Sequence, residues 1–373
     1  MVVKEVDLNT ATEAELRTLY GVGEKIAQRV ISARPFTSVL KLRSINGIGD
    51  KRFAAATTGT PRGDPTGALL VASWNVRGLS REKDTSQLRR VATIIDEFDL
   101  VALQGLRDAV VLDTLLTLLQ GWKCVVSAAV GAFSSGRNRH DPEAVTDCKS
   151  RQGAEHLAFL YRCSVVCETE PSSLALDPSY AFERAPFVGH FQVLKRQSSH
   201  SSSSSSPTGS SDVSRSDSQK QERLAETRAI ARFARDLYAQ FEDDGTAERK
   251  IVVLGAFNLA PHEISGASVG SARSSLVPLV TMSSTVFGGL ADNLCMHAAE
   301  VEATQLEYRV ESGVFRFDWA YYPSTRPEFE FGVREQQRRG ASGADRTLLQ
   351  HQMTRVLCAK EVSEHCPVWL ALW

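Results

Sequence analysis

The chain has 373 residues, and 42% of them are hydrophobic, which is enough to bury the cores of one to three domains. Its formal net charge is −1, so the whole chain is not a general binder of polyanions, and any contact with nucleic acid must come from a local patch. The seven cysteines include no CxxC pair, which argues against a zinc site and favours reduced thiols in an intracellular protein.

Residues 1–56 contain two short helical repeats, each with a glycine–hydrophobic–glycine hairpin. The first helix is expected after Thr10 or Thr12, whose hydroxyl can cap it. Glycines let the backbone approach a phosphate closely, and the helix that follows each hairpin presents free N–H groups to it. The hairpin glycines are Gly21 and Gly23 in the first repeat and Gly47 and Gly49 in the second.

Basic residues follow both hairpins: Lys25 and Arg29 after the first, and Lys51 and Arg52 after the second. Residues 1–56 hold nine Lys or Arg against six Asp or Glu, a net charge of +3. The pattern resembles a tandem helix-hairpin-helix module of the ComEA type and predicts salt-sensitive, sequence-independent contacts with DNA phosphates. The alternative is a small helical bundle whose glycines only make tight turns and which contacts other proteins.

Two further segments differ in composition from their surroundings. Residues 57–68 (TTGTPRGDPTGA) are rich in Thr, Gly and Pro, which predicts a linker. Between residues 198 and 218, 13 of 21 residues are serine. Such a segment has little apolar surface to offset its ordering entropy, so we predict a disordered insertion over residues 198–220. Apolar residues at helical spacing over 230–241 then predict an amphipathic helix.

From residue 69 onward, short β-rich runs alternate with amphipathic stretches, which predicts a layered α/β or α+β domain over residues 69–373. Helices are expected at 85–97 and 108–119, outside two packed sheets. The expected strands are 69–75, 100–104, 123–127, 156–162, 187–195, 251–254, 314–321, 354–359 and 368–373.

Five segments of this domain resemble, in order, signature motifs of the endonuclease/exonuclease/phosphatase superfamily, which includes DNase I. They are LLVASWNVRG (69–78), LVALQGL (100–106), GAFN (255–258), VFRFDWAYYPS (314–324) and SEHCPVW (363–369). The resemblance implies a four-layer DNase I-like sandwich of two packed β-sheets flanked by helices, preceded by an all-α helix-hairpin-helix domain. The chain also resembles animal proteins of this superfamily that join the two modules in this order and are associated with repair of stalled replication forks. This second resemblance implies DNA as a partner.

The resemblance also assigns a catalytic site, in which five positions keep a family-type side chain. These are Asn75, Asn258, Asp318, Glu364 and His365, with Glu364 in place of the family Asp. Gly105 replaces the Glu that is the family's main magnesium ligand, and Ala256 replaces the Asp that activates the attacking water. The retained residues can alternatively be structural groups that hydrogen-bond beneath the loops.

The family's middle strand, which ends in a His that contacts the scissile phosphate, has no clear counterpart after residue 186. His190 and His200 are the nearby histidines, and both are expected to be solvated loop residues.

Hydrolysis of a phosphodiester in this family needs a carboxylate-held magnesium ion and a base, each of which contributes strongly to the rate. The sequence therefore predicts a DNA-binding protein that is an inactive relative of repair and replication-fork nucleases and has no cofactor, with magnesium only if the domain is active. One alternative is an active, structure-selective endonuclease with displaced ligands, for which Asp108 is a candidate. The other is a protein-interaction scaffold regulated through the serine-rich loop.

No stretch of the chain approaches the roughly 20 apolar residues needed to cross a bilayer. The start, MVVKEVD, has no apolar signal core. We therefore expect an intracellular protein of the nucleus or cytoplasm.

Overall fold

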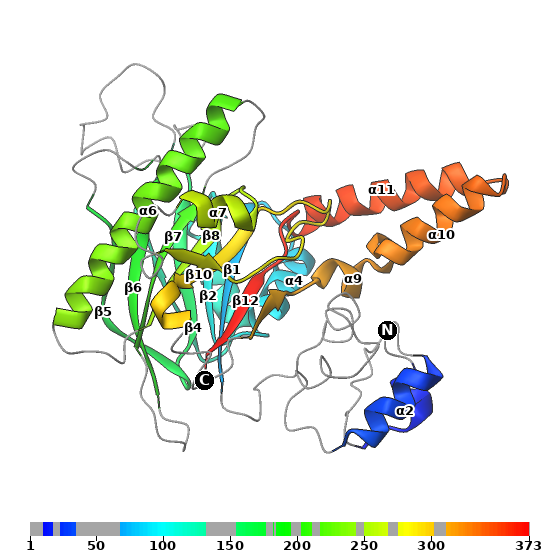
Figure 1. Cartoon of the computed structure of the whole chain (residues 1–373), viewed down its shortest axis with the longest axis horizontal. Coiled ribbons are helices and arrows are strands. Elements are labelled where there is room, and N and C mark those ends of the chain that lie inside the picture. Colours follow the sequence, from blue (N-terminus) through cyan, green and yellow to red (C-terminus); the bar gives the residue numbers. More distant parts are fainter. Residues whose placement is uncertain are drawn as a thin grey trace. The chain divides into compact units, whose positions relative to one another are not determined.

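The computed structural model describes residues 10–17, 23–34, 68–131, 154–176, 182, 184–194, 203–210, 217–243, 250–267, 275–301 and 311–372 (Figure 1). The chain divides into two compact units, which are described separately. The smaller unit comprises Met1–Ala68 and Phe315–Arg355, and the larger comprises Leu69–Val314 and Val356–Trp373. Among the described residues, no helix is both long and apolar enough to span a membrane.

The first sheet of the larger unit has the strand order β11-β12-β1-β2-β4-β3. Its central strand β1 runs parallel to β2 and antiparallel to β12. The first eight residues of β1 are all buried, which explains its nearly continuous apolar run. The strands are β1 (Leu69–Leu79), β2 (Leu100–Leu106), β3 (Trp122–Val126), β4 (His156–Arg162), β11 (Glu311–Val314) and β12 (Val368–Leu372).

The second sheet has the strand order β5-β6-β7-β8-β10-β9. Strand β8 pairs in parallel with β7 and antiparallel with β10. The strands are β5 (Val166–Leu174), β6 (Phe187–Val193), β7 (Ser203–Ser210), β8 (Lys250–Ala256), β9 (Leu276–Pro278) and β10 (Asp292–His297).

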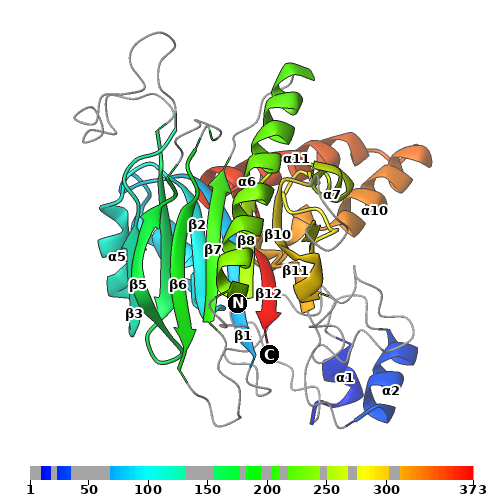
Figure 2. The same ribbon diagram turned by 60° about the vertical axis from the view of Figure 1, so that its left-hand side comes forward.

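The two sheets pack face to face, with helices on their outer sides (Figures 1 and 2). Between the sheets, the ring of Phe159 on β4 stacks on Phe187 of β6, with centroids 5.2 Å apart. Helix α6 (Asp217–Asp243) covers the second sheet, where Ile230 shares a buried cluster with Ile251 of β8. The other covering helices are α4 (Thr85–Ile95), α5 (Val111–Leu118) and α7 (Pro261–Ala267). This arrangement confirms the predicted four-layer sandwich.

The smaller unit is helical in its described parts. Helix α1 (Glu13–Leu16) begins at Thr12, whose hydroxyl accepts a hydrogen bond from the backbone N–H of Glu15 while the Glu15 carboxylate accepts one from Thr12 N–H. This capping box matches the expected chemistry at the first repeat. The remaining helices are α2 (Glu24–Ser32), α9 (Phe317–Tyr321), the 3-10 helix η5 (Pro323–Thr325), α10 (Pro327–Arg338) and α11 (Ala344–Glu361), the last of which continues into the larger unit.

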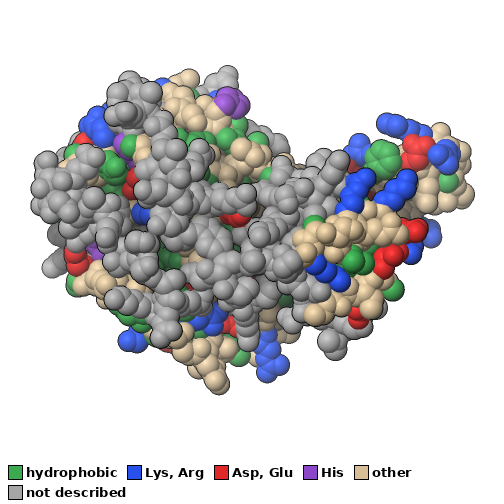
Figure 3. Space-filling view, turned by 60° about the horizontal axis from the view of Figure 1, so that its bottom comes forward, with side chains coloured by type: hydrophobic (Ala, Val, Ile, Leu, Met, Phe, Trp, Pro, Cys, Tyr) green, Lys and Arg blue, Asp and Glu red, His purple; other side chains and the backbone are tan. Residues whose placement is uncertain are grey.

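Helices α10 and α11 form a hairpin rich in charged side chains. In Figure 3, Lys and Arg side chains are interspersed with Asp and Glu on the right-hand side of the view. Within it, Glu330 accepts hydrogen bonds from Arg334, 2.7 Å away, and from Arg355, 3.0 Å away. Opposite charges at helical spacing therefore support the exposed face of α10.

Two segments expected to be strands are helical. Of the expected strand 314–321, only Val314 is in a strand, as the last residue of β11. Residues 317–321 form α9, where the buried Asp318 accepts hydrogen bonds from Arg316. Burying this carboxylate beside its guanidinium partner outweighs the β-type aromatic alternation of the segment. The expected strand 354–359 lies inside α11, because a short apolar run carries no period that separates strand from helix.

The serine-rich segment differs from the expected disorder. Residues Ser203–Ser210 form strand β7, which is hydrogen-bonded to β6 on one side and to β8 on the other. The prediction considered only the apolar surface that the segment could bury. Backbone hydrogen bonds to two flanking strands do not require apolar side chains and were not included, although Pro207 inside β7 has no N–H to donate.

Glu300, just after β10, is a buried carboxyl whose ionisation opposes folding. One carboxylate oxygen accepts a hydrogen bond from Ile251 N–H, 3.0 Å away, but burial raises the pKa of Glu300 from 4.5 to about 7. The folded state therefore binds a proton between these values that the unfolded state has lost, and the contribution of Glu300 to stability falls as pH rises through this window.

Glu300→Gln is expected to stabilise the fold relative to the natural chain above pH 7 and to lose that advantage below pH 4.5. The difference between the two free energies of unfolding should reach at most roughly 3 kcal/mol across the window. Urea unfolding at several pH values measures it. Glu335→Gln is the matched control at a half-buried position, where the carboxylate pairs with Arg339, and an equal pH profile in both variants would contradict the assignment.

Candidate functional site

The candidate site lies where strands of both sheets end. Asn75 near the end of β1 pairs in register with Gln104 of β2, because parallel strands end at the same edge of a sheet. In the second sheet, Ala256 at the end of β8 lies opposite Asp292 at the start of β10. His365 joins this edge from the loop before β12, through a bridge to Thr285.

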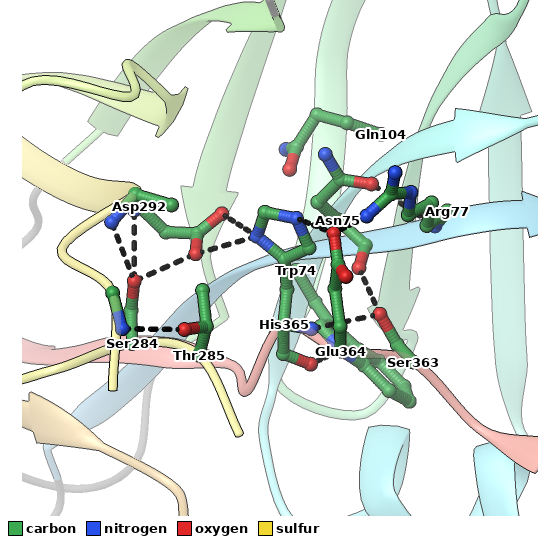
Figure 4. Close-up of polar contacts among 12 residues, drawn as sticks. Trp74, Asn75, Arg77, Gln104, Ser284, Thr285, Asp292, Ser363, Glu364 and His365 are labelled. Atoms are coloured by element: carbon green, nitrogen blue, oxygen red, sulfur yellow. Dashed lines mark hydrogen bonds and ion pairs between the residues drawn. The ribbon is translucent and has the colours of Figure 1, made fainter. Parts of the chain in front are cut away.

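A buried Asp–His pair forms the centre of the site (Figure 4). Nδ1 of His365 lies 2.8 Å and 3.0 Å from the two carboxylate oxygens of Asp292, and both side chains are almost fully buried. The Ser284 hydroxyl donates to the same carboxylate at 2.8 Å and accepts from the Asp292 backbone N–H at 2.9 Å. A carboxylate at Nδ1 fixes the orientation of the ring and turns Nε2 toward the opposite side.

Backbone contacts hold the His365 loop on β1. Trp74 Nε1 donates to the carbonyl of His365 at 2.8 Å, and the Ser363 hydroxyl donates to the carbonyl of Asn75, also at 2.8 Å. The backbone N–H of His365 donates to the Ser363 hydroxyl at 3.1 Å. These buried bonds set the position of the imidazole independently of any ligand.

Glu364 and Arg77 form an ion pair at the partly exposed side of the site. The same Glu364 oxygen, Oε1, lies 3.5 Å from Nε2 of His365. Arg77 has a positive φ of 35°, and its backbone N–H donates to Oδ1 of Asn75 at 2.9 Å. The Glu364 carboxylate thus connects Arg77 with His365, and the Asn75 side-chain amide connects to the backbone of Arg77.

Gly105 occupies a backbone conformation that other residues rarely adopt. Its φ is +75°, within an irregular stretch of the pairing between β2 and β4. A Cβ atom placed on Gly105 would lie 2.7 Å from Asn75 Oδ1 and 2.8 Å from the backbone nitrogen of Arg77. The space that a Glu side chain would need at this position is therefore filled by β1.

The resemblance places the family's main magnesium ligand at position 105 and its base at position 256, where this chain has Gly105 and Ala256. Magnesium in proteins is usually held by one or two carboxylates together with phosphate oxygens. No group of three His, Cys, Asp or Glu side chains in the described part of the chain could hold a metal ion. Asp108 is hydrogen-bonded by Arg81, which holds the pKa of its carboxyl below the usual value.

The structure brings together three of the five assigned residues: Asn75, Glu364 and His365. Asn258 follows β8, with a φ of 51°, and its N–H donates to the carbonyl of Ala291, the residue before Asp292, at 2.7 Å. Asp318 belongs to the smaller unit, where Arg316 Nε donates to its carboxylate at 2.9 Å.

The other predicted positions are placed as follows. Gly23 is the N-cap of α2, on which Lys25 and Arg29 are exposed. His190 lies in strand β6, within the expected strand 187–195, and not in a loop as expected for this residue; its Nε2 is 4.0 Å from the carboxylate of Glu170 on β5. The remaining positions lie outside the described residues: Gly21, Gly47, Gly49, Lys51, Arg52 and His200.

Sequence reasoning missed Asp292, Ser284 and Arg77. The strand that begins at Asp292 has a short apolar run without a marked period, so its hydrophobic pattern did not indicate a site residue. Arg77 lies within the motif LLVASWNVRG, but its ion pair with Glu364 depends on a left-handed backbone that the motif does not indicate. One available signal was the lone acidic residue after the Gly-Gly-Leu-Ala turn at 288–291.

Comparison with known proteins agrees with this architecture. The family described as "Endonuclease/Exonuclease/phosphatase family" matches residues 72–334, and "Helix-hairpin-helix motif" matches residues 3–58. No curated protein sequence matches the chain.

Similar solved structures include D. rerio TDP2 complexed with a single-strand DNA product, at 12% identity and a TM-score of 0.45, covering 82% of this chain and 98% of that one. A mannosyl-6-phosphatase of Bacteroides thetaiotaomicron is 14% identical with a TM-score of 0.44, covering 82% and 100%. The human Nocturnin catalytic domain with bound sulfate is 13% identical with a TM-score of 0.40, covering 66% and 85%.

The fold and the matched residues define a protein of the DNase I-like class, and the chain belongs to the endonuclease/exonuclease/phosphatase family. Within that family it combines the catalytic-type domain with a helix-hairpin-helix motif at its N-terminus.

Proposed function

We propose that this protein binds DNA through its helix-hairpin-helix module and through the candidate site around Arg77 and His365, and that this site does not hydrolyse phosphodiesters by the family's magnesium route. The observation that supports the second part is the crowding at Gly105, where a Cβ atom would lie 2.7 Å from Asn75 Oδ1 and 2.8 Å from the backbone nitrogen of Arg77. Ala256 removes the base at the same site, so two separate requirements of the reaction are lost.

The first helical repeat supports the DNA-binding part. Helix α2 begins at Gly23, and no side chain caps its N-terminus, which leaves its first N–H groups directed outward. Lys25 and Arg29 are exposed one turn apart, while Ala27 and Val30 are buried on the other face. Backbone donors with nearby positive side chains are suited to phosphate contacts of low sequence specificity.

Lys25→Glu combined with Lys51→Glu is expected to weaken binding of a labelled oligonucleotide and to lower its salt dependence. Each lost phosphate contact should reduce the slope of log K against log salt by about 1. Fluorescence anisotropy at several salt concentrations measures both effects. Lys123→Glu, a charge reversal at an exposed position on β3, is the control for a general charge effect. An affinity that is equal at low and high salt would rule out phosphate recognition.

The same preparations test hydrolysis on branched and abasic DNA, with magnesium titrated in and with EDTA. We expect no cleavage that depends on magnesium. Cleavage that disappears in EDTA and survives Asp108→Ala would contradict the proposal and favour an active endonuclease with other ligands.

A further inference from the structure

The candidate site contains a positive charge supplied by the chain itself. Arg77 follows Asn75 on β1, and its left-handed backbone turns it into the space beside Gly105. Its side chain is 47% exposed, so the guanidinium is accessible from solvent, whereas Asn75 and His365 beneath it are buried. An arginine in this place is a permanent cation with several donors that match phosphate oxygens.

The Glu364 carboxylate is placed as an internal ligand of that cation. Its Oε1 contacts Nη1 of Arg77 and lies 3.5 Å from Nε2 of His365, so one acidic oxygen lies between two nitrogen groups from different elements (Figure 4). Because Oδ1 of Asn75 accepts from Arg77 N–H, the other end of that amide is a further donor nearby. One guanidinium nitrogen in contact with the Glu364 oxygen and one imidazole nitrogen 3.5 Å from it are groups suited to an anion site.

We propose that a phosphodiester of a nucleic-acid strand displaces Glu364 from Arg77, so that arginine supplies the positive charge for which the family uses a metal ion. This inference rests on the proposed function, because it names how the candidate site around Arg77 holds DNA. Glu364 is 22% exposed in its side chain, and ion pairs with this exposure contribute little to stability, so exchange for a phosphate is inexpensive. Asp292 holds the other side of the His365 ring, so the site keeps its shape when Glu364 leaves.

The test measures binding of a fluorescein-labelled single-stranded oligonucleotide to the full chain, in EDTA and in magnesium chloride. Glu364→Gln removes the internal anion but keeps the shape of the side chain. Glu361→Gln is the matched control, because it removes the same charge from the Arg90–Glu361 ion pair. All variants are also made in the Lys25→Glu/Lys51→Glu background, which isolates the contribution of the candidate site to oligonucleotide binding.

Glu364→Gln is expected to bind about two- to fivefold more tightly than the natural chain, and Glu361→Gln to bind as the natural chain does. The gain should be equal in EDTA and in magnesium, and Arg77→Gln in the same molecule should abolish it. Equal affinities for Glu364→Gln and Glu361→Gln, or binding that EDTA abolishes, would overturn the inference. Circular dichroism confirms that each variant is folded.

The outcomes separate this inference from the proposed function. If the natural chain binds DNA but Glu364→Gln changes nothing in either background, the helix-hairpin-helix module carries the binding and only the exchange mechanism is wrong. If the natural chain binds no DNA at low salt, the proposed function fails as well. Displacement of the oligonucleotide by micromolar inorganic phosphate would mean that the site takes free phosphate, which overturns its assignment to a nucleic-acid strand.

Discussion

Gly105→Glu, the substitution that restores the family's main magnesium ligand, is expected to destabilise the protein by roughly 2 to 5 kcal/mol and to restore no activity. A φ of +75° is costly for any residue with a Cβ atom, and this Cβ would lie 2.8 Å from the backbone of Arg77. Adding Ala256→Asp should not change the outcome, because the ligand at 105 cannot reach its place without movement of β1. Urea unfolding and a magnesium-dependent cleavage assay measure the two effects.

Gly105→Ala is the matched control, since it introduces the same backbone strain and the same Cβ contact without a carboxylate. Both variants are expected to lose similar stability. A rise in melting temperature on adding magnesium that occurs in Gly105→Glu but not in Gly105→Ala would show that the carboxylate reaches a metal. That result would contradict the closed-site interpretation.

Asp292→Ala is expected to lower the free energy of unfolding by roughly 3 to 5 kcal/mol, because it leaves a buried imidazole and a buried hydroxyl without their shared acceptor. The Asp292 and His365 side chains are only 1% and 2% exposed, so water cannot replace the lost contact. Asp292→Asn keeps the shape and one acceptor oxygen, and its loss should be clearly smaller. Urea denaturation measures the series.

Asp108→Ala is the control for the loss of an acidic partner at an exposed ion pair, and its effect should be much smaller than that of Asp292→Ala. Equal losses at the two positions would mean that the Asp292–His365 pair has no special structural role. The oligonucleotide affinity of Asp292→Asn further tests whether the ring orientation matters for binding.

The sequence predicted the sandwich and β1, β2, β3, β4 and β12 of the first sheet, but only β6 and β8 of the second. Apolar β-type runs that end at a polar residue, such as the one before Asn75, are local signals that tertiary packing reinforces. The segments 314–321 and 354–359 failed because short apolar runs are ambiguous and packing decides their structure. The serine strand β7 failed because its pairing comes from backbone groups, which composition does not reveal.

The sequence was sufficient to predict which family residues are replaced at the site, but not which side chains contact one another there. Gly105 and Ala256 could be recognised as replacements from the aligned motifs alone. The partner of His365 could not, because Asp292 reaches it only through the pairing of β10 with β8, which places residues far apart in sequence at one edge. The close approach of β1 to Gly105 depends on the positive φ angles of Arg77 and Gly105. Glycine is the only residue type that signals such a backbone in a sequence, so the conformation of Arg77 could not be predicted.

The pairing of β1 with β12 has a consequence for how the protein is made. Trp74 and His365, joined by a buried hydrogen bond, are 291 positions apart in the chain. Such long-range contacts slow folding, since the entropy of loop closure must be overcome before they form. Until residues 368–372 have joined the sheet, the buried strand β1 has β2 as its only described neighbour in the first sheet, and its other edge is open to pairing with another chain.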